Sequence, residues 1–163
     1  DPIDDPAFAT CSNEPGLVRQ AASILPKKIT QYDDRMIIEY EGFAGQRVIY
    51  LDGRGSETEE HTRFGHHVAR YEDDVLVIET SQLLGHLTGP EGNALSDQTT
   101  TVERYRRTDN PEAGPSLEMT LIVSDPGRLT EPWTIITRFT PAEPEYEFAE
   151  VDCQLPLLGP EEK

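Results

Sequence analysis

Basic residues are scarce in this chain. Its 163 residues include 14 lysines and arginines against 31 aspartates and glutamates, which gives a formal net charge of −17. A charge this negative repels nucleic-acid phosphates and anionic lipid head groups. We therefore expect neither nucleic acid nor a membrane surface as a partner.

Long apolar runs are also missing. No stretch approaches the roughly 18 apolar residues that a membrane-spanning helix needs, and no apolar signal-peptide core remains at the start. The chain begins at Asp1 rather than at a methionine, which fits a processed mature chain or an otherwise shortened one. We expect no membrane insertion.

Cysteine occurs only twice, as Cys11 and Cys153. If the two pair, they tie the ends of the chain together, a cross-link worth about 4–5 kcal/mol in the chain-entropy model. An even number of cysteines near the ends favours an oxidising compartment, so we expect a periplasmic or secreted chain after signal removal. The alternative is two unrelated buried thiols.

The familiar motifs of cofactor chemistry are absent too. The chain has no phosphate loop, dinucleotide fingerprint, nucleophile elbow or kinase signature, so nucleotide-dependent chemistry is not expected. Three histidines, His61, His66 and His67, follow Glu59 and Glu60, but their spacing matches no zinc or iron motif. We therefore predict no cofactor and no metal.

What the chain does have is apolar alternation with a period of two, separated by turn residues. Apolar residues at helical spacing before Pro26 predict one short helix, after an extended arm. From residue 28 onward the pattern predicts about eight strands, at 36–41, 46–51, 66–72, 75–81, 98–108, 117–123, 133–140 and 145–151.

These elements predict a single all-β domain. We expect an antiparallel meander that closes, or nearly closes, into a lipocalin-like barrel, because closure removes exposed strand edges. A two-sheet sandwich is the competing architecture. The arm and helix occupy residues 1–27, the barrel residues 28–155 and a tail residues 156–163.

Several segments resemble a group of bacterial exported β-rich proteins of unassigned function. The resemblance lies in RVIYLDGR at 47–54, GHHVARYEDDVLVIET at 65–80, Ser96-Asp97, VERY at 102–105, Asp125-Pro126, PWT at 132–134, Tyr146 and Cys153. The chain departs from the pattern at Ala69 and Asp73, where glycine is usual, and at Tyr71, where tryptophan is usual. The resemblance implies an exported β-rich domain and no particular activity.

The hairpin around Asp73-Asp74 carries the first candidate site. If Glu72 faces Val75, then His66, Arg70, Glu72 and Glu79 share one face of the hairpin. His66, Arg70 and Glu79 could then act as an acid/base group, with the guanidinium holding an oxyanion. The alternative is a solvated outer face with an Arg–Glu pair of little energetic value.

A second candidate is the pair Glu103 and Arg104, which lie mid-strand on opposite faces. In a closed barrel one of them must point inward, and a buried charge needs a partner. The internal one is either a functional residue, with Glu103 as a catalytic candidate and Arg104 as a ligand-binding one, or half of a structural ion pair.

Aromatic side chains in the strands supply the remaining candidates. A small barrel uses such side chains to line either its core or a ligand cavity. The candidate ligand-binding aromatics are Tyr40, Tyr50, Tyr105, Trp133 and Tyr146.

Two functions remain after these exclusions. The first is binding of a small molecule in a partly apolar, aromatic-lined cavity. The second is a cofactor-free lyase, isomerase or cyclase with acid/base residues inside the barrel. A third possibility, an envelope interaction protein, predicts a filled core without a cavity.

Overall fold

The structure, a computed structural model, describes residues 16–41, 45–55, 60–85, 94–112 and 114–149. In this part of the chain the protein is an all-β structure with one short helix, as the sequence predicts. Cys11 and Cys153 lie outside the described residues. The elements are α2 (Leu17–Ala22), β1 (Lys27–Gln31), β2 (Arg35–Tyr40), β3 (Gly45–Tyr50), β4 (His66–Glu72), β5 (Val75–Ser81), β6 (Thr100–Asn110), β7 (Gly114–Ser124) and β8 (Trp133–Phe139).

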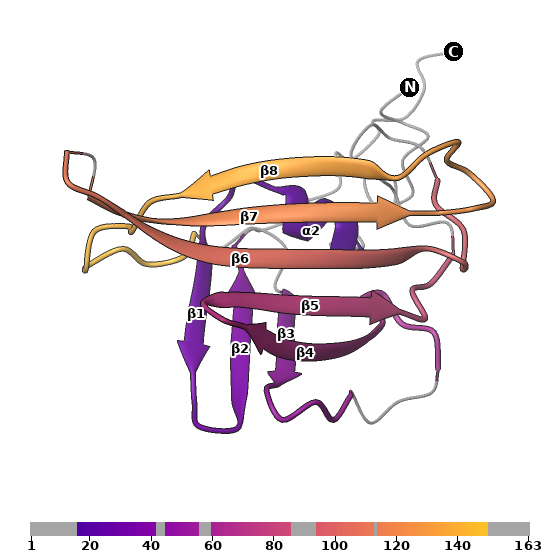
Figure 1. The fold of residues 1–163 in the computed structure, drawn as a ribbon, viewed down its shortest axis with the longest axis horizontal. Helices are drawn as coiled ribbons and strands as arrows, with labels where there is room; N and C mark the ends of the chain where they lie inside the picture. The colour runs from indigo at the N-terminus through magenta and orange to yellow at the C-terminus, as the bar shows by residue number, and fades with distance from the viewer. Residues whose placement is uncertain (1–15, 42–44, 56–59, 86–93, 113, 150–163) are drawn as a thin grey trace, which may run out of the picture.

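The strands form two antiparallel meanders. One sheet has the order β1-β2-β3 and the other the order β4-β5-β6-β7-β8. Figure 1 shows the strands of the smaller sheet running across those of the larger one. Within the described residues no hydrogen-bonded ladder joins the two sheets, so the predicted barrel closure is not confirmed.

The core fills the space between the sheets and includes one side of α2. Leu17, Val18 and Ala21 of this helix are buried in the same cluster as the inward side chains of both sheets, and the helix packs beside β7 (Figure 1). The rest of the cluster comes mostly from strand positions two residues apart, as in β2 and β7.

The hairpin of β4 and β5 confirms the sequence prediction closely. Both strands have the predicted bounds, and Glu72 lies opposite Val75, Arg70 opposite Val77 and Val68 opposite Glu79. A two-residue turn leaves little freedom in how the strands align, so register follows from turn length.

Two strand predictions were wrong. β1 was not predicted, because its residues KKITQ lack apolar alternation; it pairs with β2 along its whole length. The predicted last strand at 145–151 is not a strand over residues 145–149. Instead, Tyr146 Oη and the Ala149 N–H donate to Glu41 Oε1, at 2.6 and 2.7 Å.

Membrane-crossing helices are not found either. None of the helical residues in the described segments forms a stretch with the length and apolar character needed to cross a bilayer.

Candidate functional site

Glu103 lies in the interior of the protein, on the inward face of β6. Its side chain is fully buried, whereas the Arg104 guanidinium points outward and donates to Glu72 Oε2 at 2.9 Å. Strand alternation places neighbouring side chains on opposite faces. Of the two mid-strand charges, Glu103 is therefore the internal one.

The partner of Glu103 is Arg47 of β3, in the other sheet. Arg47 Nη1 lies 2.9 Å from Glu103 Oε1 and 3.1 Å from Oε2, and both side chains are completely buried. Arg47 Nη1 also donates to Tyr40 Oη at 3.0 Å, and Tyr105 Oη donates to Glu103 Oε2 at 2.6 Å. We call Arg47, Glu103, Tyr40 and Tyr105 the buried ionic centre.

The buried ionic centre shifts the protonation equilibria of its own members. Burial, opposed by the charge of Arg47, raises the pKa of Tyr40 to about 12. Burial and the neighbouring Glu103 carboxylate raise the pKa of Tyr105 well above its usual value. Burial alone disfavours the charged guanidinium of Arg47, but the attraction of Glu103 keeps the pKa of Arg47 above its ordinary value. At neutral pH both phenols are thus protonated and the arginine is charged, so that Tyr40 accepts from Arg47 while Tyr105 donates to Glu103.

His67, unlike its neighbour His66, is a buried residue that was not among the predicted catalytic residues. Its Nε2 lies 2.8 Å from the Val48 carbonyl oxygen of β3. Because a carbonyl only accepts, Nε2 carries the proton and donates. Burial, and then the charge of Arg47, lower the pKa of His67 to about 4, so the ring is neutral at pH 7. The contact also joins β4 to β3 where no sheet ladder does.

Next to the buried ionic centre runs a row of polar side chains. His67, Thr80 and Thr101 lie opposite one another across β4, β5 and β6. His67 Nδ1, both threonine hydroxyls and Nε and Nη2 of Arg47 are buried without a hydrogen-bond partner among the described residues. This row therefore places five polar atoms without a described partner next to the buried ionic centre.

The predicted catalytic group at the hairpin faces the outside. Arg70 pairs with Glu79 at 2.9 Å and with Glu72 at 2.8 Å, and all three side chains are 40–52% exposed. Beneath them Val77 is completely buried, because the arginine stems opposite it, from Arg70 and Arg104, cover it. This arrangement supports a structural role for the outer face.

His66 begins β4 and is half-buried on the same face. Its imidazole ring lies where a Cβ atom at residue 55 would be, so the absence of a side chain at Gly55 allows this close approach. The structure therefore packs His66 against a loop backbone.

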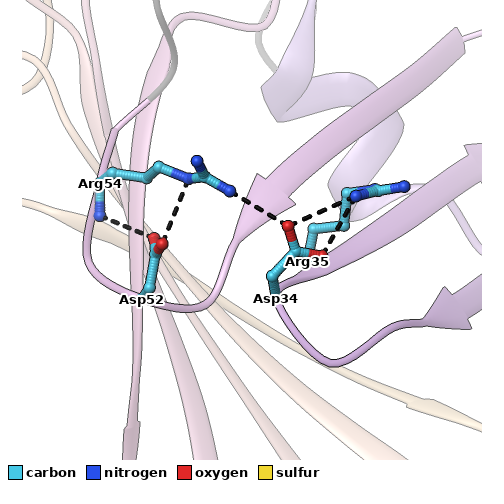
Figure 2. Close-up of polar contacts among 4 residues, drawn as sticks. All are labelled: Asp34, Arg35, Asp52 and Arg54. Carbon is cyan, nitrogen blue, oxygen red and sulfur yellow. Dashed lines mark hydrogen bonds and ion pairs between the residues drawn. The ribbon is translucent and has the colours of Figure 1, made fainter.

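Three predicted ligand-binding aromatics lie away from the buried ionic centre. Tyr50 is stacked under the Arg54 guanidinium at 4.0 Å, and Figure 2 shows Arg54 bridging two surface aspartates beside Arg35. Tyr146 is 46% exposed, and Trp133 is a half-buried residue against the core. Tyr40 and Tyr105 alone belong to the buried ionic centre.

A pocket of about 390 Å³ opens between the two sheets, above Tyr105. Its walls come from β1 and β2 on one side and from the β4–β5 turn, β6 and β7 on the other. The lining residues are mostly apolar, with a few polar ones: Ile29, Gln31, Met36, Ile38, Tyr71, Asp74, Leu76, Tyr105, Arg107 and Leu117.

Tyr105 is the single predicted site residue that lines this pocket, and it connects the pocket to Glu103. Met36, Ile38 and Leu117 do lie in segments that the sequence predicts as strands, 36–41 and 117–123. The sequence did not show that these strands face each other across a gap, because they belong to different sheets.

The site thus defines a class: a two-sheet antiparallel β-protein with an ion pair in its core and a pocket beside it. Comparisons with protein-family models, curated proteins and solved structures found no match. Among the residues that the structure describes, no three histidine, cysteine, aspartate or glutamate side chains are grouped so as to hold a metal ion.

Proposed function

We propose that this protein binds a small, largely apolar molecule in the pocket between its sheets. The observation that carries the proposal is the pocket itself: about 390 Å³, within the range of roughly 300–1,000 Å³ typical of small-molecule sites. Five aliphatic side chains and two tyrosines supply apolar contact. Gln31, Asp74 and Arg107 supply polar anchors at the pocket.

The proposal includes a lipocalin-like container that is nearly closed. Two contacts between sheets support it, one along each side. His67 binds the Val48 carbonyl between β4 and β3, and the Lys27 ammonium lies 4.3 Å from the centre of the Phe139 ring between β1 and β8. The pocket is lined by Ile29 and Gln31 of β1 and by Leu117 of β7, so the container opens between these strands.

A cofactor-free lyase, isomerase or cyclase is the second candidate. The observation in its favour is that Tyr105 borders the pocket while its hydroxyl is bonded to Glu103. Because the single O–H of Tyr105 donates to Glu103, its phenol oxygen acts towards a substrate as a hydrogen-bond acceptor. Binding is the better supported function, because the remaining pocket walls are mainly apolar.

The test is a titration with the neutral fluorophore N-phenyl-1-naphthylamine, whose emission rises in apolar surroundings. We expect saturable binding to the wild-type protein. Leu117→Trp fills the pocket with a larger ring, so it should weaken the dye at least about tenfold, a change of about 1.4 kcal/mol.

The matched control is Ile136→Trp on β8, where the native side chain is 67% exposed and lies outside the pocket. It should bind the dye within about twofold of wild type, since it changes no pocket contact. Equal affinity in the two tryptophan variants, or no saturable binding to the wild type, contradicts the proposal. Glu103→Gln then separates the candidates: an enzyme loses turnover with retained affinity.

A further inference from the structure

The deep part of the pocket between the sheets is apolar. Its most buried lining residues are Met36, Ile38, Leu76 and Tyr105, each no more than 6% exposed. Leu76 and Tyr105 are strand partners, so their side chains form one continuous surface. The only polar group among these four side chains is the Tyr105 hydroxyl, which is bonded to Glu103. The deep part of the pocket therefore offers a ligand no charge.

The rim of the pocket differs from its deep part, because most rim residues carry polar groups. The exposed lining residues include Gln31, Tyr71, Asp74 and Arg107. Tyr71 is the strand partner of Leu76, so its ring, which is 48% exposed, continues the buried surface out to solvent. A ligand that fills the pocket therefore places an apolar body inside and a polar end at this rim.

Two opposite charges line the rim, and one of them already has a partner. Arg107 Nη2 lies 3.4 Å from Oδ1 of Asp109, two residues further along the same face of β6. The Asp74 carboxylate, in the turn between β4 and β5, forms no ion pair or hydrogen bond with any residue that the structure describes. The charge that remains for a ligand at the rim is therefore negative.

The charge of the whole molecule acts in the same direction. A net charge of −17 attracts cations and repels anions, most strongly at low ionic strength. The exposed ring of Tyr71 adds a further attraction, because the face of an aromatic ring favours a positive charge. A positively charged end of a ligand therefore fits this rim better than a negatively charged one.

We propose that the pocket is a site for cationic amphiphiles, that is, small aryl- or alkylamines with one charged end, an assignment that rests on the proposed binding function. The apolar body of the ligand lies against Met36, Ile38, Leu76 and Tyr105. Its ammonium group lies at the rim, where the Asp74 carboxylate accepts its hydrogen bonds. The Tyr71 ring contacts the same group.

The experiment compares three ligands that share one apolar skeleton and differ in charge. They are 4-phenylbutylamine, a cation at neutral pH, the neutral 4-phenylbutan-1-ol and the anion 4-phenylbutyrate. Displacement of N-phenyl-1-naphthylamine from the wild-type protein at low ionic strength gives the affinity of each. We expect the amine to bind more tightly than the alcohol and at least about tenfold more tightly than the carboxylate, because Asp74 attracts the first and repels the last.

Two variants of the turn between β4 and β5 separate Asp74 from the general negative charge. Asp74→Asn and Asp73→Asn each remove one negative charge, but of these two residues Asp74 is the one that lines the pocket. Asparagine also tolerates the positive φ of 54° at residue 73. Asp74→Asn should weaken the amine at least about fivefold, whereas Asp73→Asn should stay within about twofold of wild type. Both should bind the neutral dye as the wild type does.

Tighter binding of the carboxylate than of the amine overturns the inference, and so does an equal loss of amine affinity in Asp74→Asn and Asp73→Asn. An amine that fails to displace the dye, or that binds no more tightly than the alcohol, also overturns it. Each of these results leaves the proposed function standing if the dye itself binds and Leu117→Trp weakens it. Failure of dye binding to the wild-type protein overturns the proposed function instead.

Discussion

Arg47 and Glu103 carry opposite charges at the centre of the core, and both side chains are fully buried. Breaking such a pair leaves one charge without a partner in a medium of low polarity, which costs about 3–5 kcal/mol. We therefore expect Glu103→Leu to lower the free energy of unfolding by about that amount. Arg47→Met combined with Glu103→Leu should lose less than Glu103→Leu alone, because no charge is left behind. Urea denaturation measures both.

Glu118→Leu on the outside provides the comparison. Glu118 pairs with Arg138 at 3.0 Å, but the two side chains are 35% and 65% exposed, so its loss should cost less than about 1 kcal/mol. Arg47→Met alone completes the comparison in the core. If the loss in the Arg47→Met, Glu103→Leu double variant equals the sum of the losses in Arg47→Met and Glu103→Leu, the two charges do not act as a pair.

His67 predicts a dependence of stability on pH. Its pKa of about 4 in the folded protein lies below the ordinary value of 6.5, so the unfolded chain binds a proton more readily. The stabilisation is present above pH 6.5 and is lost as the pH falls from about 6.5 toward 4, by up to about 3 kcal/mol. His67→Gln keeps an N–H donor for the Val48 carbonyl without titrating, so its stability should change less between pH 7 and pH 5.

Thr101→Val gives a control from the same buried polar row without a titratable group. Its curve of unfolding free energy against pH should run parallel to that of the wild type. A His67→Gln curve parallel to wild type between pH 5 and 7 would show that the buried imidazole is not the source.

At the scale of elements, Asp125 ties the segment before β6 to the end of β7. It is 2% exposed and accepts from the Ser96 N–H and hydroxyl, the Thr99 hydroxyl and the Gly127 N–H, at 2.6–3.0 Å. We expect Asp125→Ala to cost about 2–4 kcal/mol, because several bonds are lost and buried donors are left unpaired. Thermal unfolding tests this, with the exposed Asp97→Ala as a control expected within about 0.5 kcal/mol of wild type.

Strand prediction succeeded where neighbouring residues, through apolar alternation and a short turn, were enough to define the strands. Residues 66–81 combine alternation with a two-residue turn, and the predicted bounds and register are those observed. β1 was not predicted because its residues lack apolar alternation; its backbone hydrogen bonds to β2 make it a strand. The predicted strand at 145–151 fails over its described part because Glu41 takes up Tyr146 Oη and the Ala149 N–H, while Pro141 and Pro144 just before it donate no backbone hydrogen bond.

At the scale of the whole molecule the net charge of −17 sets the response to salt. Self-repulsion destabilises a compact acidic chain, and salt screens it. We expect the melting temperature to rise by about several degrees between 10 and 500 mM sodium chloride. Chloride is the suitable salt because sulfate also strengthens apolar burial. A melting temperature that falls over this range would mean that specific ion pairs outweigh the general repulsion.

The candidate site was only partly predictable. Glu103, Tyr40 and Tyr105 were singled out as candidates in strands, and the structure brings them together. Arg47, their common partner, lies 56 residues before Glu103 in another sheet, and nothing local to its sequence marks it as internal. The acid/base trio was placed on the correct face of its hairpin, but only the packing shows that this face is outside.

The sequence by itself determined the acidic surface, the all-β class and the register of the β4–β5 hairpin, because charge, alternation and turn length act within a few residues of the chain. Tertiary structure alone decided that Glu103 and not Arg104 is internal, that Arg47 forms its ion pair, and that a pocket lined in part by Tyr105 remains between the sheets. These outcomes depend on how two sheets without a shared ladder pack face to face. That packing is set by contacts between residues far apart in the chain, which no local pattern encodes.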